Sequence, residues 1–458
     1  MKRTVSILLM SIFWTVAAAR SAEWQPGAPA GADTLRTAAP MSLNDCMRYA
    51  VEHSPAVRRQ DYTNRSYRQD YIESVAALVP SVSGSVGAST SFGRSVDPET
   101  NTYTDVSNFD NSYGVSGQLP LFAGLTGINT VRAAKVMRLQ GAEELQIARD
   151  EVALKTMQAY FDVVYYTGSV QLAREQLETS TAELKKSRKL LELGLRSAAD
   201  VAEVESQQAS DDYLLTQQEN NLALARIALA EAMNYPADRP LEIDTAVSIE
   251  TPAGAAPYDE VVSYALENHP KALSADYGVR RSRLQFSVAR GSLYPSLYVG
   301  GGYSTNFFMS LDNRTLYASF PNQFRDNRGF YVSAQLSIPI FGGLARRTSM
   351  NRARNNWHIA EQQRMETLRA LESEVAQAYQ QMLGYGKEFV QASKKSAAAQ
   401  LAYDAVAGKY AQGLASALDL QTAADKLLEA RSERLRARLQ YIIKVRLVEY
   451  YHGEPLIR

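Results

Sequence analysis

The stretch Gly194-Leu195-Arg196-Ser197-Ala198-Ala199-Asp200-Val201 recurs 219 positions later as Gly413-Leu414-Ala415-Ser416-Ala417-Leu418-Asp419-Leu420. Three further pairs of stretches recur in the same order: Tyr49-Ala50-Val51-Glu52 with Tyr264-Ala265-Leu266-Glu267, Leu78-Val79-Pro80-Ser81 with Leu293-Tyr294-Pro295-Ser296, and Leu119-Pro120-Leu121-Phe122 with Ile338-Pro339-Ile340-Phe341. The offset is 215 for the first two of these pairs and 219 for the last. The chain is therefore a duplicated unit, and the change of offset predicts an exposed loop between Pro80 and Pro120.

The bulk properties fit one long body built from the two copies. The chain has 458 residues and a formal net charge of +0, which gives no indication of a nucleic-acid partner. We assign residues 23–235 to the first structural repeat and residues 258–458 to the second. Residues 236–257 form a linker with four prolines. Because the linker joins the end of one copy to the start of the next, it should lie midway along the body.

The N-terminus has the composition of a secretory signal peptide, which we assign to residues 1–22. A basic start, Met1-Lys2-Arg3, precedes an apolar run from Val5 to Val16 and then three alanines. The alternative is a membrane anchor, but the run is shorter than the roughly 20 residues that a spanning helix needs. We expect cleavage after Ala19 or Ala22 and export from the cytoplasm.

No catalytic constellation stands out in the sequence. The single cysteine, Cys46, has no partner for an intrachain disulfide and matches Val261 in the second copy. We interpret it as a small buried hydrophobe rather than a reactive thiol. The four histidines are scattered without the spacing of a metal site. We therefore expect a protein that is not an enzyme, has no cofactor and takes its energy from a partner.

Each copy begins with signals for two helices. Ser42 followed by Asp45 predicts a capping box at the start of the first helix. Pro55 suits the first turn of a second helix, which should end near Leu78, before Pro80.

Each copy ends in a stretch that predicts a very long helical hairpin. No proline lies between Pro120 and Pro236, and strong helix formers fill the interval. A helix from about Leu125 to Leu193 would be about 100 Å long, a length typical of a coiled coil or a helical tube. Gly194 should form the hairpin tip, with Ser197 capping the returning helix, and Gly413 and Ser416 should do the same in the second copy. The returning helices should span about 198–233 and 417–451.

Four segments between the helices alternate apolar and small polar residues with a period of two. Their apolar sides are Val82, Val86, Ala88 and Phe92; Tyr113, Val115 and Leu119; Leu297, Val299, Tyr303 and Phe307; and Phe330, Val332, Ala334, Leu336 and Ile338. The pattern is typical of transmembrane β-strands, although a soluble two-layer sheet would show the same alternation. Aromatic residues near the strand ends favour the membrane. Loops are expected at 96–111 and 309–328.

Four membrane strands cannot form a closed structure alone, because an open sheet edge cannot face lipid. Three copies supply twelve strands, within the known range of barrels. The same trimer would stack its hairpins into a helical tube beneath the barrel. The rival reading is a non-channel periplasmic helical scaffold with a small soluble sheet.

These duplicated stretches together resemble the TolC-like outer membrane efflux proteins, over essentially the whole mature chain. The fold class implied is mostly α with membrane β: a homotrimer with a 12-stranded outer-membrane barrel continuous with a long periplasmic α-helical barrel. The resemblance also implies an exit duct of a tripartite efflux pump or a type I secretion system. A periplasmic adaptor and an inner-membrane transporter would open the duct at its periplasmic tip.

The resemblance assigns an aperture to the second tip. Asp419 matches an aspartate that forms a ring at the closed periplasmic end in the family. Thr422 stands where a second acidic ring would fall, so one ring is expected from this region. The alternative for Asp419, and for Asp200 in the first tip, is an ordinary solvated acid in the first turn of a helix.

The resemblance also assigns latch and docking residues. Tyr410 and Asp200 match latch positions of the family, whereas the latch arginine is replaced by Ala415. Arg196 occupies the equivalent place in the first tip, so the latch pairing should differ in this chain. The residues expected to meet the adaptor are Gly194, Leu195, Ser197, Gly413, Leu414 and Ser416.

Overall fold

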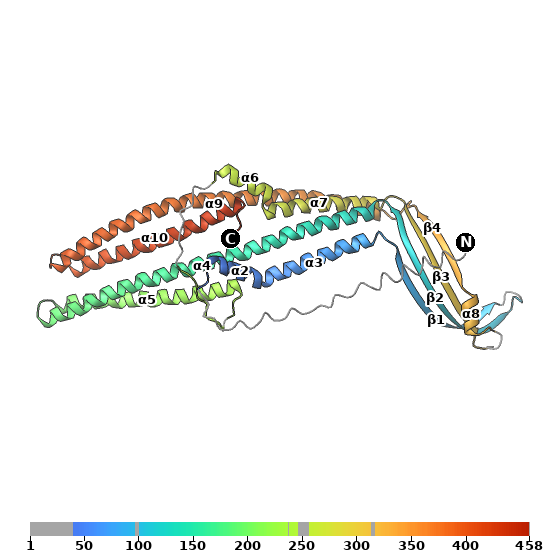
Figure 1. Ribbon diagram of the computed structural model, residues 1–458, viewed down its shortest axis with the longest axis horizontal. Helices are drawn as coiled ribbons and strands as arrows, with labels where there is room; N and C mark the ends of the chain where they lie inside the picture. Colours follow the sequence, from blue (N-terminus) through green and yellow to red (C-terminus); the bar gives the residue numbers. More distant parts are fainter. Residues whose placement is uncertain (1–39, 97–99, 237, 246–255, 313–316, 458) are drawn as a thin grey trace.

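The computed structural model describes residues 40–457, with the exception of residues 97–99, 237, 246–255 and 313–316. The predicted signal peptide therefore lies outside the described residues. The body is elongated, with a β-sheet at one end and two helical hairpin tips at the other (Figure 1). Among the described helices, none combines the length and the apolar character needed to cross a membrane.

The two copies contribute matching series of elements. The first copy contains α2 (Leu43–His53), α3 (Pro55–Ala76), β1 (Ser81–Val96), β2 (Tyr103–Ala123), α4 (Thr126–Glu192) and α5 (Ala198–Met233). The second contains α6 (Tyr258–Asn268), α7 (Pro270–Gly291), β3 (Ser296–Ser310), α8 (Phe320–Asp326), β4 (Gly329–Ser337), α9 (Ala345–Ala411) and α10 (Ala417–Tyr451). The expected long helices and their returning partners are confirmed, and α4 and α9 have 67 residues each.

The strands form one antiparallel sheet in the order β1-β2-β3-β4. Val86 pairs with Tyr113, and Tyr113 pairs with Thr305 on the next strand. Tyr303 then pairs with Phe330 on β4. Because directly paired residues share a face, this register places the apolar sides of all four strands on one face, as the alternation predicts.

Both expected loops contain regular structure. β2 begins at Tyr103, not after residue 111, and pairs with β1 up to Val96. Charged residues in this region lie on paired strands, where Arg94 and Asp105 form an ion pair of 3.6 Å. The expectation of a loop over 96–111 was therefore wrong for residues 103–111.

The second expected loop, 309–328, contains the short helix α8. Its Phe320 and Phe324 contact Tyr113 and Phe307 on the apolar face of the sheet, with ring centroids 5.2–6.2 Å apart. The Gln323 side chain accepts a hydrogen bond from the Phe308 amide and donates one to its carbonyl. α8 thereby covers the part of the β3 edge that lies beyond the end of β4.

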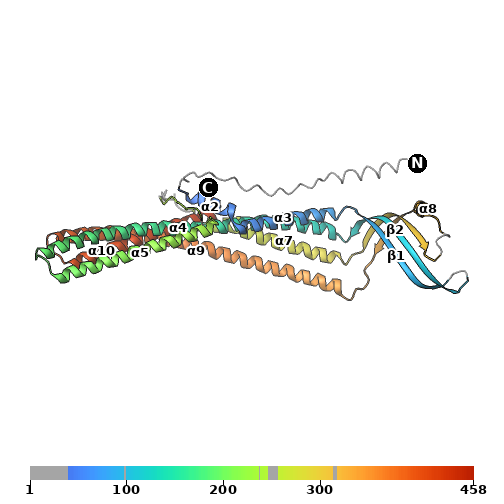
Figure 2. The ribbon, with the colours of Figure 1, turned by 90° about the horizontal axis from the view of Figure 1, so that it is seen from below.

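The helices pack side by side along the body (Figures 1 and 2). Near the sheet, the packed order is α3, α4, α7 and α9. Toward the tips, α5 packs against α4, and α10 packs against both α4 and α9. The short helices α2 and α6 lie midway along the body.

Two related apolar cores lie at this midway position. The first includes Cys46, Phe161 and Leu229 and is formed by α2, α4, α5 and α10. The second includes Val261 and Val375 and is formed by α6, α7, α9 and α10. Cys46 is fully buried, as expected from its match to Val261. Burial raises the pKa of its thiol to about 12, which makes it unreactive.

Candidate functional site: the two hairpin tips

Each long helix ends at a glycine in a left-handed conformation. Gly194 has a φ of +72° and Gly413 a φ of +74°. The Leu195 amide donates to the Leu190 carbonyl at 2.8 Å, and the Leu414 amide donates to the Lys409 carbonyl at 2.9 Å. These bonds satisfy carbonyls that the end of a helix leaves unpaired. Glycine reverses the chain at both tips because a side chain disfavours this φ.

Each returning helix begins with a capping box. In the second tip, the Asp419 carboxylate accepts from the Ser416 amide at 3.0 Å and from its hydroxyl at 2.7 Å. In the first tip, Asp200 accepts from the Ser197 amide at 3.3 Å. The hydrogen bonds from the backbone and side chain of Ser416 lower the pKa of Asp419. Both acids are exposed and cap their own helices in the single chain.

The tips also present two exposed leucines. Leu195 and Leu414 each expose 73% of their surface, at equivalent positions next to the turn glycines. Isolated exposed leucines are common on protein surfaces. Here one leucine lies at the tip of each hairpin. The pair forms a matched apolar feature at the end of the molecule farthest from the sheet.

A polar cluster behind the tips joins the two hairpins. We call Glu183, Ser187, Arg196 and Tyr410 the tip cluster. Arg196 donates to the Tyr410 hydroxyl at 2.5 Å and to Glu183 at 3.5 Å, and it also contacts Ser187. The Tyr410 hydroxyl in turn donates to Glu183. Tyr410 comes from α9, whereas the other three residues come from the first hairpin.

The tip cluster is shielded from solvent and electrostatically coupled. Tyr410 is 8% exposed, and the side chains of Arg196 and Glu183 are 16% and 19% exposed. Burial alone would lower the pKa of Arg196. The hydrogen bonds of Arg196 to Tyr410 and Glu183 have the larger combined effect and raise its pKa. Burial and the bond to Glu183 raise the pKa of Tyr410. The arginine therefore stays charged and the phenol stays protonated at neutral pH.

A second polar group lies next to the tip cluster, between α5 and α10. We call Gln207 and Asp211 on α5, with Gln421 and Asp425 on α10, the deeper polar layer. Gln207 donates to Asp211 at 2.9 Å and to Asp425 at 3.4 Å, and it accepts from Gln421. Asp211 is 4% exposed, and burial raises its pKa. Its Oδ2 atom has no hydrogen-bond partner among the described residues.

The structure brings together only part of the predicted site. Arg196 and Tyr410 make direct contact, a pairing that the sequence did not specify. Asp200 lies outside this cluster, at its own helix cap. Glu183 was not predicted. It is one of many acids on a long polar helix, and the spacing of the sequence does not single it out.

The sheet and hairpins define a class of protein. An exposed four-stranded sheet with one apolar face, continued by two long helical hairpins, is a subunit of an outer-membrane channel with a long periplasmic portion. The family model described as outer membrane efflux protein matches residues 47–235 and 261–450. The chain belongs to the outer membrane efflux protein family, which is a family of channels and not of enzymes.

Known relatives include both efflux and secretion proteins. The outer membrane efflux protein BepC of Brucella suis is 24% identical over 80% of this chain and 75% of its own length. The alkaline protease secretion protein AprF of Pseudomonas aeruginosa is 23% identical over 90% of this chain and 84% of its own length. The relatives are thus named for efflux and for secretion, and the family match makes this chain an outer membrane efflux protein.

Solved structures share the fold. A structure of CusC covers 92% of this chain and 96% of its own, with a TM-score of 0.76 and 16% identity. The outer membrane protein VceC of Vibrio cholerae covers 90% of this chain and 96% of its own, with a TM-score of 0.74 and 17% identity.

Proposed function

We propose that the chain works as a homotrimeric duct that rests closed at its periplasmic tips and opens when partners separate the hairpins. The observation that carries the proposal is the tip cluster, which joins the two hairpins through Arg196, Tyr410 and Glu183. In this proposal, a periplasmic adaptor docks at the tips and an inner-membrane transporter supplies the energy.

The sheet supports a trimer. Both outer strands, β1 and β4, have one edge that pairs with no described strand of the same chain. An unpaired edge in lipid leaves backbone groups unsatisfied. Pairing β4 of each copy with β1 of the next closes the sheet, and three copies give a barrel of twelve strands.

The helices support the same assembly through the duplication. Within one chain, the α7 and α10 pair of the second copy packs between α9 and α4. The matching α3 and α5 pair of the first copy packs chiefly on α4, and α5 makes only a small contact with α10. Its other side would therefore receive α9 of the neighbouring subunit. Exposed apolar residues on α5 and α9, such as Leu224, Ile227 and Leu401, support this contact; each exposes more than half of its surface.

The contacts between the hairpins behind the tips support a gate that can separate. Arg431 on α10 binds Glu175 on α4 of the other hairpin at 3.2 Å, and it is held by Gln400 on α9 of its own hairpin at 2.6 Å. The Glu175 contact, the tip cluster and the deeper polar layer are polar, and Ala417 of α10 adds a small apolar contact with Leu184, Val201 and Val204. Water can replace polar partners when helices separate, so opening costs less than exposing an apolar core of the same size.

The proposed roles of the exposed tip residues follow from symmetry. A three-fold axis brings three copies of any aperture residue close together. Asp419 would form one acidic ring there, with Asp200 near the aperture, and Thr422 would add no second ring. The docking role is proposed for Leu195 and Leu414, which are exposed at the ends of the hairpins.

The test is planar-bilayer conductance of the wild type and of Asp419→Asn. Three carboxylates around one axis attract cations, and a multivalent cation relieves their repulsion. The wild-type duct should prefer cations and be blocked by a trivalent cation from the periplasmic side. Asp419→Asn should weaken both effects, and Glu192→Gln, which changes an acid at the end of α4, is the matched control.

Three outcomes would count against parts of the proposal. Equal block and selectivity in the wild type and Asp419→Asn would show that Asp419 is only a helix cap. A trimer that never conducts would refute the gated duct. A water-soluble monomer would favour the alternative of a periplasmic helical scaffold.

A further inference from the structure

A cavity of about 370 Å³ lies midway along the body, far from the tips. It forms where α10 ends and α7 begins, beside the continuous helix α4. The segment after α10, Gly453–Ile457, passes along it. We call this space the equatorial cavity. Its volume falls within the range of small-molecule sites, and no residue of the tip cluster lines it.

Aromatic side chains form much of the cavity wall. Tyr264, Tyr450 and Tyr451 line it together with the imidazole of His269. The His269 ring lies 5.3 Å from the ring of Tyr450 and 5.7 Å from that of Tyr451, centroid to centroid. Such walls favour a planar apolar guest, because aromatic rings gain from stacked or edge contacts.

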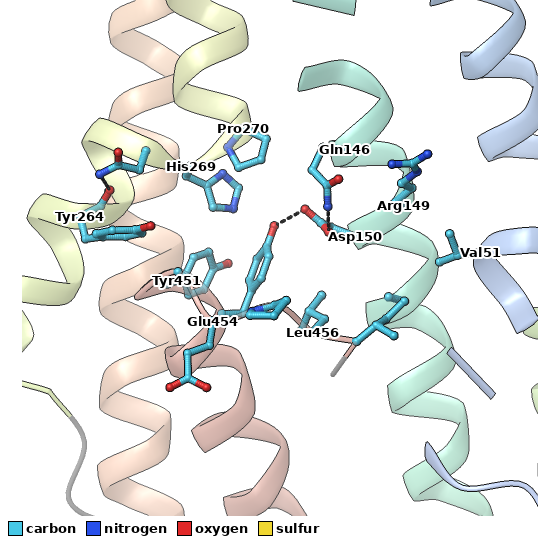
Figure 3. Close-up of a pocket in the computed structure, with 16 residues that line it drawn as sticks. Val51, Gln146, Arg149, Asp150, Tyr264, His269, Pro270, Tyr451, Glu454 and Leu456 are labelled. Atoms are coloured by element: carbon cyan, nitrogen blue, oxygen red, sulfur yellow. Dashed lines mark hydrogen bonds between the residues drawn. The ribbon is translucent and has the colours of Figure 1, made fainter. Parts of the chain in front are cut away.

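A fixed carboxylate lies on the opposite side. Figure 3 shows His269 and Tyr451 on one side of the cavity and Gln146 and Asp150 on the other. Asp150 is 7% exposed. Its carboxylate accepts from Gln146 at 2.8 Å and from the Tyr450 hydroxyl at 2.8 Å, so each oxygen already has a donor.

His269 offers a donor that the protein leaves unused. The residue is 6% exposed, and its Nδ1 accepts from the Lys271 amide at 3.2 Å. Burial and the nearby Lys271 lower its pKa to about 4, so the ring is neutral at physiological pH. With Nδ1 accepting, the single ring hydrogen resides on Nε2. Nε2 is buried and has no hydrogen-bond partner among the described residues.

We propose that the equatorial cavity binds a small uncharged aromatic molecule that presents an acceptor oxygen. Its ring would pack against the tyrosines, and its oxygen would accept from Nε2–H of His269. An uncharged guest is favoured because the charged residues of the lining have opposite signs, Arg149 against Asp150 and Glu454, and the aromatic wall offers no compensation for a further charge. A cation is disfavoured further because the free group of His269 is a donor, which cannot pair with an ammonium.

The probe is benzamide, whose carbonyl is an acceptor on an aromatic ring, and benzylamine is the matched cation. Saturation-transfer difference NMR on the trimer in detergent should show binding of benzamide and much weaker binding of benzylamine. A control with micelles that contain no protein measures how much of each probe enters the detergent. Absence of benzamide binding, or equal binding of the two probes, would overturn the proposal.

The first variant removes only the donor. His269→Ser copies Ser54, which caps α3 at the equivalent position of the first copy, so the start of α7 should remain intact. Losing one hydrogen bond should weaken benzamide binding about fivefold. His358→Ser, at an exposed histidine on α9, should leave it unchanged. Equal affinity of the wild type and His269→Ser would show that the imidazole does not hold the ligand.

The second variant fills the cavity and keeps the test decisive if His269→Ser fails to assemble. Leu456 lines the space on the segment after α10. Leu456→Trp should occupy the volume needed by the ring and lower benzamide binding at least tenfold. Undiminished binding to an assembled Leu456→Trp trimer would place the ligand elsewhere.

Discussion

Tyr410→Phe tests the gate most directly because it removes one hydroxyl and keeps the ring. That hydroxyl accepts from Arg196 and donates to Glu183. The ring also lies 5.3 Å from the Arg196 guanidinium, a contact that phenylalanine preserves. The variant should therefore leave the packing behind the tips in place and weaken only the polar link between the hairpins.

The expected size of the effect follows from the charged partners. A hydrogen bond to a charged group contributes about 1.5–3 kcal/mol. The ion pair between Arg196 and Glu183, at 3.5 Å, remains in the variant. We therefore count the loss of one hydrogen bond per chain, at about 1.5 kcal/mol. If three chains open together, the closed state loses about 4.5 kcal/mol. Because about 1.4 kcal/mol is a tenfold change, the open population should rise about a thousandfold.

The assay is single-channel recording in planar bilayers, with open probability as the readout. Tyr403→Phe is the matched control. Tyr403 lies two turns earlier on α9 and lines the same space behind the tips, but its hydroxyl hydrogen-bonds to no described residue. Tyr403→Phe should keep the wild-type open probability. An open probability of Tyr410→Phe equal to that of Tyr403→Phe would refute the tip cluster as a latch.

Three further predictions test the sheet, the tips and the deeper polar layer. Val86→Arg should lower the free energy of unfolding by about 2–4 kcal/mol in a thermal unfolding assay if Val86 faces lipid near the midplane. Ser85→Arg should fold normally and lower conductance. Equal stability of the two variants would contradict the assigned faces. Replacing Leu195 and Leu414 together with Asp should abolish export but leave the trimer in the membrane, and unchanged export would place docking elsewhere. Burial raises the pKa of Asp211, so the folded state binds the proton of this carboxyl more tightly than the unfolded state does. The free energy of unfolding should therefore fall as the pH rises from the unfolded pKa of about 3.9 through the folded pKa. Asp211→Asn should remove this part of the pH dependence, and an unchanged profile would contradict it.

Most of the helical architecture could be predicted from the sequence because local chemistry determines it. Both capping serines and both turn glycines of the tips lie where the repeated stretch placed them. The faces of the strands were also predictable, since alternation and register agree. The start of β2 was not, because Asp105, Asn108 and Asp110 interrupt the apolar alternation there, and this part is strand through its pairing with β1.

The candidate site was less predictable than the fold. Arg196 was identified through its place in the first tip and Tyr410 through the resemblance to the efflux proteins, and the structure joins them. Glu183 and Asp211 lie on long polar helices where acids recur without a diagnostic spacing. Their importance comes from burial between hairpins that are more than 200 residues apart in sequence. Only the three-dimensional packing distinguishes them from solvated acids.

The nature of the packing changes along α10 and suggests where the duct can move. From Gln421 to Arg431, the helix is joined to the first hairpin by hydrogen bonds and an ion pair. From Leu439 to Ile443, the same helix enters the apolar core at the middle of the body. Separating the tips would therefore break ion pairs and hydrogen bonds, which salt weakens, while the apolar core that holds the hairpins together stays buried. We infer that the hairpins bend between these two regions. A wild-type open probability that does not change with ionic strength would contradict this inference.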